Sequence, residues 1–188
     1  MLAVAALVLA TSARPLPAQE MPIPIDVQVP LLLKVLKYEK TLPQRAGDEV
    51  VIGVLFQKKF RNSLNARDGF NEAFSQAGLS ELLDRPTRRV DIEFVGTEEI
   101  GAIIERDGID ILYVAPLRAA SLSSVVDAAS AHKTLTLSGV PDYAENGVMV
   151  SVTERRNRPS ILLNLNTASA AGVTFSSELL KVAQIVGR

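Results

Sequence analysis

One stretch decides the fold: Glu49–Phe56, which reads EVVIGVLF. It is a nearly continuous apolar run rich in β-branched residues, as expected for a strand that is buried on both faces. Strands of this kind occur in parallel sheets whose two faces are covered by helices. We therefore expect an α/β protein in which this segment is the first strand of the sheet.

Helices and strands are predicted to alternate along the chain after this first strand. The periodicity of apolar residues predicts helices over residues 63–77, 98–107 and 121–132, and strands over residues 90–95, 109–115 and 133–138. The resulting βαβαβαβ order calls for right-handed crossovers and a parallel sheet. Residues 148–153 and 160–166 predict an antiparallel hairpin at the sheet edge, and a last helix is expected over residues 176–186.

The N-terminal residues are expected to lie outside the folded domain. Residues 2–9 (LAVAALVL) are apolar but too few to span a bilayer as a helix, which takes about 20 residues. Small residues and prolines follow, so we expect residues 1–18 to be a cleaved signal peptide that directs export. A buried N-terminal helix is the alternative, which the prolines oppose. Residues 19–29 are expected to form an extended linker, and residues 30–188 a single domain whose first helix starts at Pro30.

Composition argues against several classes of function. The chain of 188 residues has no Cys, no Trp and one His, and its formal net charge is −1. Neither a disulfide nor a Cys-based zinc site can form, and one chain with a single His cannot build a two-histidine metal site. The low net charge and the scarcity of aromatic residues argue against nucleic-acid binding. We expect no metal, no cofactor and no nucleic-acid partner.

No residue pattern in the sequence points to catalysis. His132 is expected to be a helix-capping or partly exposed residue, with a catalytic or ligand role as the alternative. Asp91 and Glu93 share one strand face and are interpreted as a solvated edge, against the alternative of a paired-carboxylate or metal site. Asn166 is expected to cap a short helix, the alternative being a ligand contact. We therefore expect a binding protein and not an enzyme.

A candidate ligand crevice is expected at the carboxyl ends of the first and third strands, given the flavodoxin-like strand order that the family resemblance described below implies. In open α/β sheets, ligands bind at this edge, beside the point where the strand order reverses. The crevice would be lined by residues of two loops: Gln57, Lys58, Arg61, Pro116, Leu117 and Arg118. Their positive charges would suit an anionic ligand near a helix N-terminus, and a solvated basic loop is the alternative.

Three segments resemble the YfiR-like family of periplasmic proteins. They are Leu31–Pro43 (LLLKVLKYEKTLP), Leu135–Val150 (LTLSGVPDYAENGVMV) and Ile161–Ile185 (ILLNLNTASAAGVTFSSELLKVAQI). The resemblance implies a flavodoxin-like three-layer α/β/α sandwich, a mostly parallel sheet with a C-terminal antiparallel hairpin, and no enzyme activity. It also implies a periplasmic location and repression of a membrane diguanylate cyclase, hence a role in cyclic di-GMP signalling. Leu42 replaces the usual Trp, and the family's cysteines are absent, so redox control is not implied.

The expected function is that of a periplasmic regulatory or adaptor protein that binds a partner protein. The partner would be the periplasmic sensor domain of a membrane-bound receptor, either a diguanylate cyclase or a sensor kinase. A small-molecule binding protein of the transporter type is the alternative. Such proteins normally have two lobes, and this chain has the size of one.

The closing helix is the candidate protein interface. Its polar residues recur at every third position, so apolar residues cover more than half of its circumference. Either this helix and the opening helix pack on each other as well as on the sheet, or they leave an apolar strip for a receptor or for a homodimer. Leu180 and Ile185 flank a main stripe that includes Leu179 and Val182, so they are the positions that distinguish the two cases.

Overall fold

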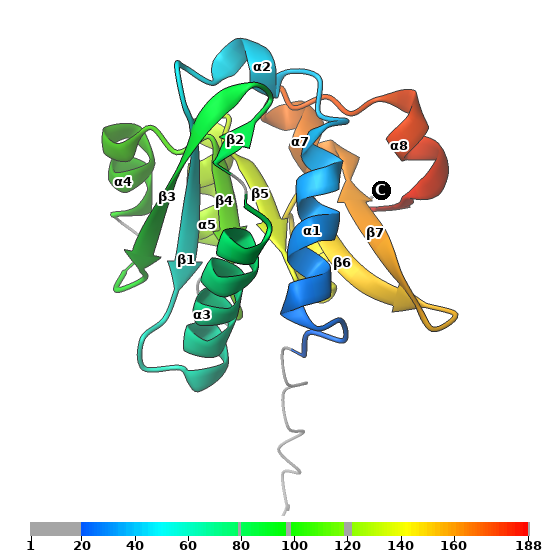
Figure 1. The fold of residues 1–188 in the computed structure, drawn as a ribbon, viewed down its shortest axis with the longest axis horizontal. Helices are drawn as coiled ribbons and strands as arrows, with labels where there is room; N and C mark the ends of the chain where they lie inside the picture. Colours follow the sequence, from blue (N-terminus) through cyan, green and yellow to red (C-terminus); the bar gives the residue numbers. More distant parts are fainter. Residues whose placement is uncertain (1–19, 79, 97–98, 119–121, 188) are drawn as a thin grey trace, which may run out of the picture.

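The computed structural model describes residues 20–78, 80–96, 99–118 and 122–187 (Figure 1). Within these residues the strands form one sheet in the order β2-β3-β1-β4-β5-β6-β7-β8. Their bounds are β1 Val50–Phe56, β2 Glu81–Leu82, β3 Arg85–Glu93, β4 Ile111–Val114, β5 Leu135–Ser138, β6 Val150–Arg155, β7 Arg158–Asn164 and β8 Gln184–Val186. The helices are α1 Ile25–Leu36, α2 Leu42–Arg45, α3 Arg61–Gln76, α4 Ile100–Asp107, α5 Leu122–Ala131, α6 Asp142–Glu145, α7 Leu165–Ala170 and α8 Ser177–Val182.

Five neighbouring strands, β3, β1, β4, β5 and β6, run parallel to one another. Numbered along the chain, their spatial order is second, first, third, fourth and fifth, which is the flavodoxin-like order. The antiparallel β6–β7 hairpin follows them. The expected sandwich, with its mostly parallel sheet and C-terminal hairpin, is therefore confirmed.

Two apolar cores fill the space on the two sides of the sheet. Strand β1 shows the division, because Ile52 and Val54 belong to the core under α1 and α3. Val51 and Leu55 belong to the second core, under α4 and α5. Each residue of β1 is buried, which explains why this strand is apolar without alternation.

The opening helix starts earlier than the sequence predicts. α1 begins at Ile25 and contains Pro30, so residues 25–29 are helical and not extended as expected for the linker. A proline inside a helix costs about 3 kcal/mol. Val29, Leu32 and Leu33 are all buried against the sheet, and each contributes about 1.5–3 kcal/mol by leaving water. Burial therefore outweighs the cost of the proline.

The closing segment also differs from the prediction. α8 ends at Val182, Ala183 is extended with φ −83° and ψ 157°, and the chain continues as strand β8. β8 pairs in parallel with β7, placing Ile185 beside Leu163. The hairpin therefore does not form the sheet edge, because β8 lies outside it. Pairing with the open edge of β7 favours the extended conformation over the helical pattern of the sequence.

The second predicted strand is longer than expected. β3 begins at Arg85 and forms a tight hairpin with β2, in which Leu83 and Asp84 have φ angles of 56° and 60°. Among the described residues, no helix has both the length and the apolar character that crossing a membrane would demand.

Candidate functional site

The structure joins the two loops of the predicted crevice at the carboxyl edge of the sheet. The Arg118 N–H donates to Oε1 of Gln57 over 2.8 Å, and the Gln57 N–H donates to Ser63 Oγ over 2.8 Å. The Arg118 guanidinium lies over the Phe60 ring, 5.4 Å from its centroid. Gln57 and Arg118 are thus brought together, and this contact sets the position of the loop that precedes α3.

The other predicted crevice residues divide into two groups. Lys58 and Arg61 are exposed, with no ion pair to any described residue. Leu117 is only 1% exposed and belongs to the core, so its side chain does not line a crevice. Its N–H donates to the Tyr143 hydroxyl, whose pKa is raised to about 12 by burial. Pro116 is buried at the margin of a small cavity of about 360 Å³.

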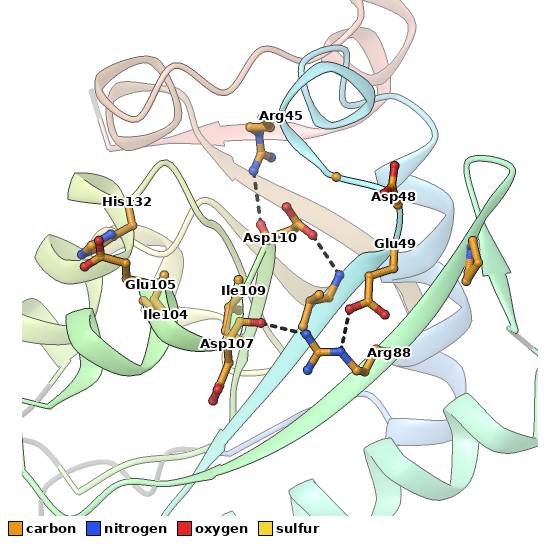
Figure 2. Close-up of a pocket in the computed structure, with 14 residues that line it drawn as sticks. Arg45, Asp48, Glu49, Arg88, Ile104, Glu105, Asp107, Ile109, Asp110 and His132 are labelled. Carbon is orange, nitrogen blue, oxygen red and sulfur yellow. Dashed lines mark hydrogen bonds and ion pairs between the residues drawn. The ribbon is translucent and has the colours of Figure 1, made fainter.

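A larger cavity of about 720 Å³ lies at the opposite, amino edge of the sheet (Figure 2). Segments far apart in the chain build it: the turn before β1, the start of β3, the end of α4 with the loop that follows, and His132 after α5. The sequence did not reveal this site, because its charged residues are distributed over loops, a strand and helices that are far apart in the chain. The signal that was available is the acidic character of the segments immediately before β1 and β4.

Both arginines of this cavity are engaged by neighbouring groups. Arg88 Nε lies 2.8 Å from Glu49 Oε1, and Arg88 also donates to the carbonyl of Asp107 over 2.9 Å (Figure 2). Arg45 donates to the carbonyl of Asp110 over 3.2 Å. These interactions leave little positive charge for an anionic ligand.

The Asp110 carboxylate lies at the start of β4, where its Oδ2 accepts a hydrogen bond of 2.9 Å from the Val51 N–H. Burial raises the pKa of Asp110 above its ordinary value, while the Val51 hydrogen bond and the charge of Arg45 oppose the rise. The Asp110 carboxylate thus links β4 to β1 through the Val51 N–H, and it loses part of its contact with water in doing so.

The cavity has an excess of carboxylates, and its described lining contains no hydroxyl, thiol or amine side chain. Asp48 and Glu105 line it with side chains that make no hydrogen bond or ion pair to any described residue. Ser, Thr, Tyr, Cys and Lys are absent from its described lining. In the described part of the chain, no three His, Cys, Asp or Glu side chains are grouped in a way that would hold a metal ion. The arrangement suits a cationic or polar neutral ligand.

The residues proposed for a protein interface lie on two different elements. Leu180 is 37% exposed on α8, whereas Ile185 is half-buried in β8 and packs against the core. The prediction that both flank one helical stripe is therefore wrong. Val182, which is predicted to lie in the main apolar stripe, is 75% exposed, because the chain leaves the helix at this residue. Only Leu179 of the stripe within α8 is buried.

The contacts of the remaining candidate residues, His132, Asp91 and Asn166, are those of structural residues. His132 is exposed, and Nε2 would lie 3.2 Å from a Cβ atom placed on Gly101 of α4. Asp91 pairs with Arg67, whose Nη1 is 3.1 Å away. Asn164, and not Asn166 as predicted, caps α7, because its Oδ1 accepts from the Thr167 N–H over 3.0 Å.

Comparison with solved structures finds the same fold in three bacterial proteins. They are an ABC domain in complex with L-Trp from Streptococcus pneumoniae (TM-score 0.59, 17% identity), a conserved domain protein from Vibrio cholerae O1 biovar El Tor (0.59, 16%) and a substrate-binding protein with adhesive properties from Clostridium difficile in its ligand-free, open form (0.57, 18%). Each alignment covers 87% of this chain but only 62%, 60% and 60% of the respective neighbour. At such identities the likeness shows the fold alone.

Sequence comparison identifies a family for this chain but no individual curated relative. No curated protein matches the chain. The model of the YfiR/HmsC-like family matches residues 26–184, which run from the first turn of α1 into β8. The chain therefore belongs to the YfiR/HmsC-like family.

Proposed function

We propose that this protein is a periplasmic regulatory protein that acts by binding a partner protein and has no enzyme activity of its own. The partner is the periplasmic sensor domain of a membrane diguanylate cyclase. Family membership supports the regulatory role. The observation that carries the binding role is the 75% exposure of the Val182 side chain at the passage from α8 into the edge strand β8.

The α8–β8 corner, residues 177–186, has the properties of a binding surface. α8 is held to the body by the buried Leu179, and Leu180 and Val182 are exposed on either side of it. Within the described residues, no strand pairs with the outer edge of β8, and β8 carries no charged residue. Soluble proteins usually protect such edges with charge or proline. An extended segment of a partner can pair there while contacting Val182.

The cellular test compares Val182 with an equally exposed valine elsewhere. Val95, after β3, is 72% exposed, so Val95→Asp is a matched control for Val182→Asp. Deletion of the gene is expected to raise cellular cyclic di-GMP, and the wild-type and Val95→Asp proteins to restore it. The Val182→Asp protein should accumulate folded without restoring it. An unchanged cyclic di-GMP level on deletion would exclude the cyclase as the regulated enzyme, and full complementation by Val182→Asp would exclude the corner as the interface.

The periplasmic location rests on the signal peptide expected over residues 1–18, which lie outside the described residues. Its test is the intact mass of the protein recovered from the periplasmic fraction. The mature chain should begin after Ala18. A full-length chain found in the cytoplasm would contradict export.

A second candidate function is small-molecule binding, favoured by the cavity of Figure 2. Its volume of about 720 Å³ falls in the usual range for ligand pockets, about 300–1,000 Å³. Because Asp48 and Glu105 leave negative charge in it, a cationic probe such as putrescine is the appropriate test ligand. Putrescine should raise the melting temperature of the wild-type protein and have a smaller effect on Asp48→Asn. Equal shifts in both proteins would show binding elsewhere.

A further inference from the structure

Exposed cations without an ion pair gather at the carboxyl edge of the sheet. Three ion pairs lie at the amino edge: Arg45 with Glu39, Arg88 with Glu49 and Arg106 with Asp107. At the carboxyl edge, Arg67 lies over the Phe56 ring and pairs with Asp68 and Asp91. Six other cations at this edge are exposed and form no ion pair with any described residue. They are Lys58, Lys59, Arg61, Arg155, Arg156 and Arg158.

These six cations form two projections at similar height. Val54 of β1 and Val150 of β6 lie on one row across the parallel strands. Lys58 follows Val54 by four residues, and Arg155 follows Val150 by five, so both extend past the ends of β4 and β5. Figure 1 shows the β1–α3 loop and the tip of the β6–β7 hairpin toward the lower end of the molecule. Three strand spacings separate β1 from β6, a distance of about 14 Å.

The turn of the β6–β7 hairpin contains an arginine, Arg156, with a positive φ angle that is unfavourable for a long side chain. Arg156 and Asn157 form the turn with φ angles of 52° and 58°. Asn and Gly are the usual residues of such turns, whereas a longer side chain with positive φ carries a conformational cost. Glu154, Asp142 and Glu145 border a small cavity together with Arg155, so they offset part of its charge. Arg156, in the turn itself, does not line that cavity.

The β1–α3 loop adds a second source of positive potential. Lys58 and Lys59 precede α3, a helix of 16 residues without an acidic residue in its first turn. The positive end of the helix dipole therefore adds to the lysine charges, where a surface helix usually carries carboxylates. The whole chain has a net charge of −1. Attraction to an anionic surface therefore requires that the molecule turn its positively charged end toward that surface.

We propose that the β1–α3 loop and the β6–β7 hairpin tip together form a basic rim that binds the anionic headgroups of a phospholipid bilayer. Two projections of similar height, carried by strands that lie three spacings apart, suit a broad surface that offers many phosphates. Arginine recognises phosphate with paired hydrogen bonds, and lysine adds a point charge. The contact is electrostatic and weakens with salt. This inference goes beyond regulatory partner binding and rests on residues other than those of the α8–β8 corner.

Vesicle co-sedimentation tests the rim with three variants that each remove three positive charges. Two lie in the rim: Lys58→Gln/Lys59→Gln/Arg61→Gln and Arg155→Gln/Arg156→Gln/Arg158→Gln. The matched control, Lys34→Gln/Lys37→Gln/Lys40→Gln, removes exposed lysines along and after α1. The wild-type protein should bind equimolar phosphatidylglycerol–phosphatidylcholine vesicles and not phosphatidylcholine alone. Each rim variant should lose at least about tenfold in affinity, and the control should not.

Several outcomes overturn the proposal. One is that the wild-type protein does not bind the phosphatidylglycerol vesicles. Another is that the control variant loses as much affinity as the rim variants, which would show that binding depends on net charge and not on the position of the charges. Inhibition of vesicle binding by glycerol phosphate at equal phosphate concentration would assign the rim to a soluble phosphate compound. Rim variants that bind vesicles normally but no longer bind the sensor domain would make the rim a protein contact. Val182→Asp should bind vesicles like the wild type, so failure of the regulatory proposal leaves this result unaffected.

Discussion

The guanidinium of Arg45 lies 3.2 Å from the carboxylate of Glu39, and the Glu39 side chain is completely buried. The same carboxylate accepts hydrogen bonds from the N–H and the hydroxyl of Thr41, and from the Thr174 N–H over 3.4 Å. Glu39 also forms an isolated β-bridge with Phe175. Glu39 therefore joins the segment after α1 to the segment before α8, which are far apart in the sequence, and Arg45 balances its buried carboxylate.

Removing Arg45 should be strongly destabilising. Arg45→Ala leaves the Glu39 charge buried without its counter-ion, and loss of one partner of a buried pair typically costs about 3–5 kcal/mol. The control is Arg88→Ala, which breaks the Arg88–Glu49 pair, where both side chains are more than 40% exposed. Exposed pairs contribute about 0–1 kcal/mol. Urea unfolding should separate the two variants clearly, and equal losses would show that the Arg45–Glu39 pair contributes no more to stability than an exposed pair.

Gly139 should not tolerate a methyl group. A Cβ atom at this position would lie 1.8 Å from Oε1 of Gln28, which is fully buried on α1. Gly139→Ala is therefore expected to cost about 1–3 kcal/mol, the usual range for overpacking a core. The double variant Gln28→Ala/Gly139→Ala removes the clash, so alanine at Gly139 should cost less in the Gln28→Ala background. If the two substitutions are additive in thermal unfolding, the close approach does not determine the cost.

Asp110 should make stability depend on pH. Its pKa in the folded protein is raised above the ordinary 3.8, mainly by burial, so the folded state binds this proton more tightly than the unfolded chain. The group therefore favours folding below about pH 3.8 and loses that contribution as the pH rises through the folded pKa. Asp110→Asn retains an acceptor for the Val51 N–H. It should be more stable than the wild type at neutral pH, by a margin that disappears in acid. Lower stability of Asp110→Asn at neutral pH would mean that Arg45 and Arg85 outweigh desolvation.

Two adjacent leucines of α8 should respond differently to truncation. Leu179 is 4% exposed in the core, and Leu180 is 37% exposed. Leu179→Ala should cost about 2–5 kcal/mol, as expected for a core leucine. Leu180→Ala should stay within about 1 kcal/mol, since more than a third of its surface already contacts water in the folded state. Similar losses in a denaturant titration would place Leu180 in the core and remove it from the proposed interface.

Periodic segments of this protein can be predicted from their own residues. β1 is apolar at successive positions because both of its faces are covered, and α3 buries Ala66, Phe70 and Ala73 at helical spacing. These patterns reflect interactions that each segment makes with a whole layer, so they do not depend on which residue lies opposite. Alternation of such segments predicted the parallel sheet, whereas its strand order, and with it the proposed crevice at Gln57 and Arg118, followed from the family resemblance.

The sequence by itself determined the α/β class, the hairpin at the C-terminal end and the absence of cysteine and paired-histidine chemistry. Tertiary structure alone decided the start of α1, the change from helix to strand after Val182, the burial of Glu39 and the charged cavity between β1 and α4. Each of these depends on a contact between distant segments, such as Ile185 with Leu163 or Glu39 with Thr174. Local propensities amount to tenths of a kcal/mol per residue, whereas burial and sheet pairing contribute about 1 kcal/mol or more. Where the two conflict, the distant partner therefore decides the local structure.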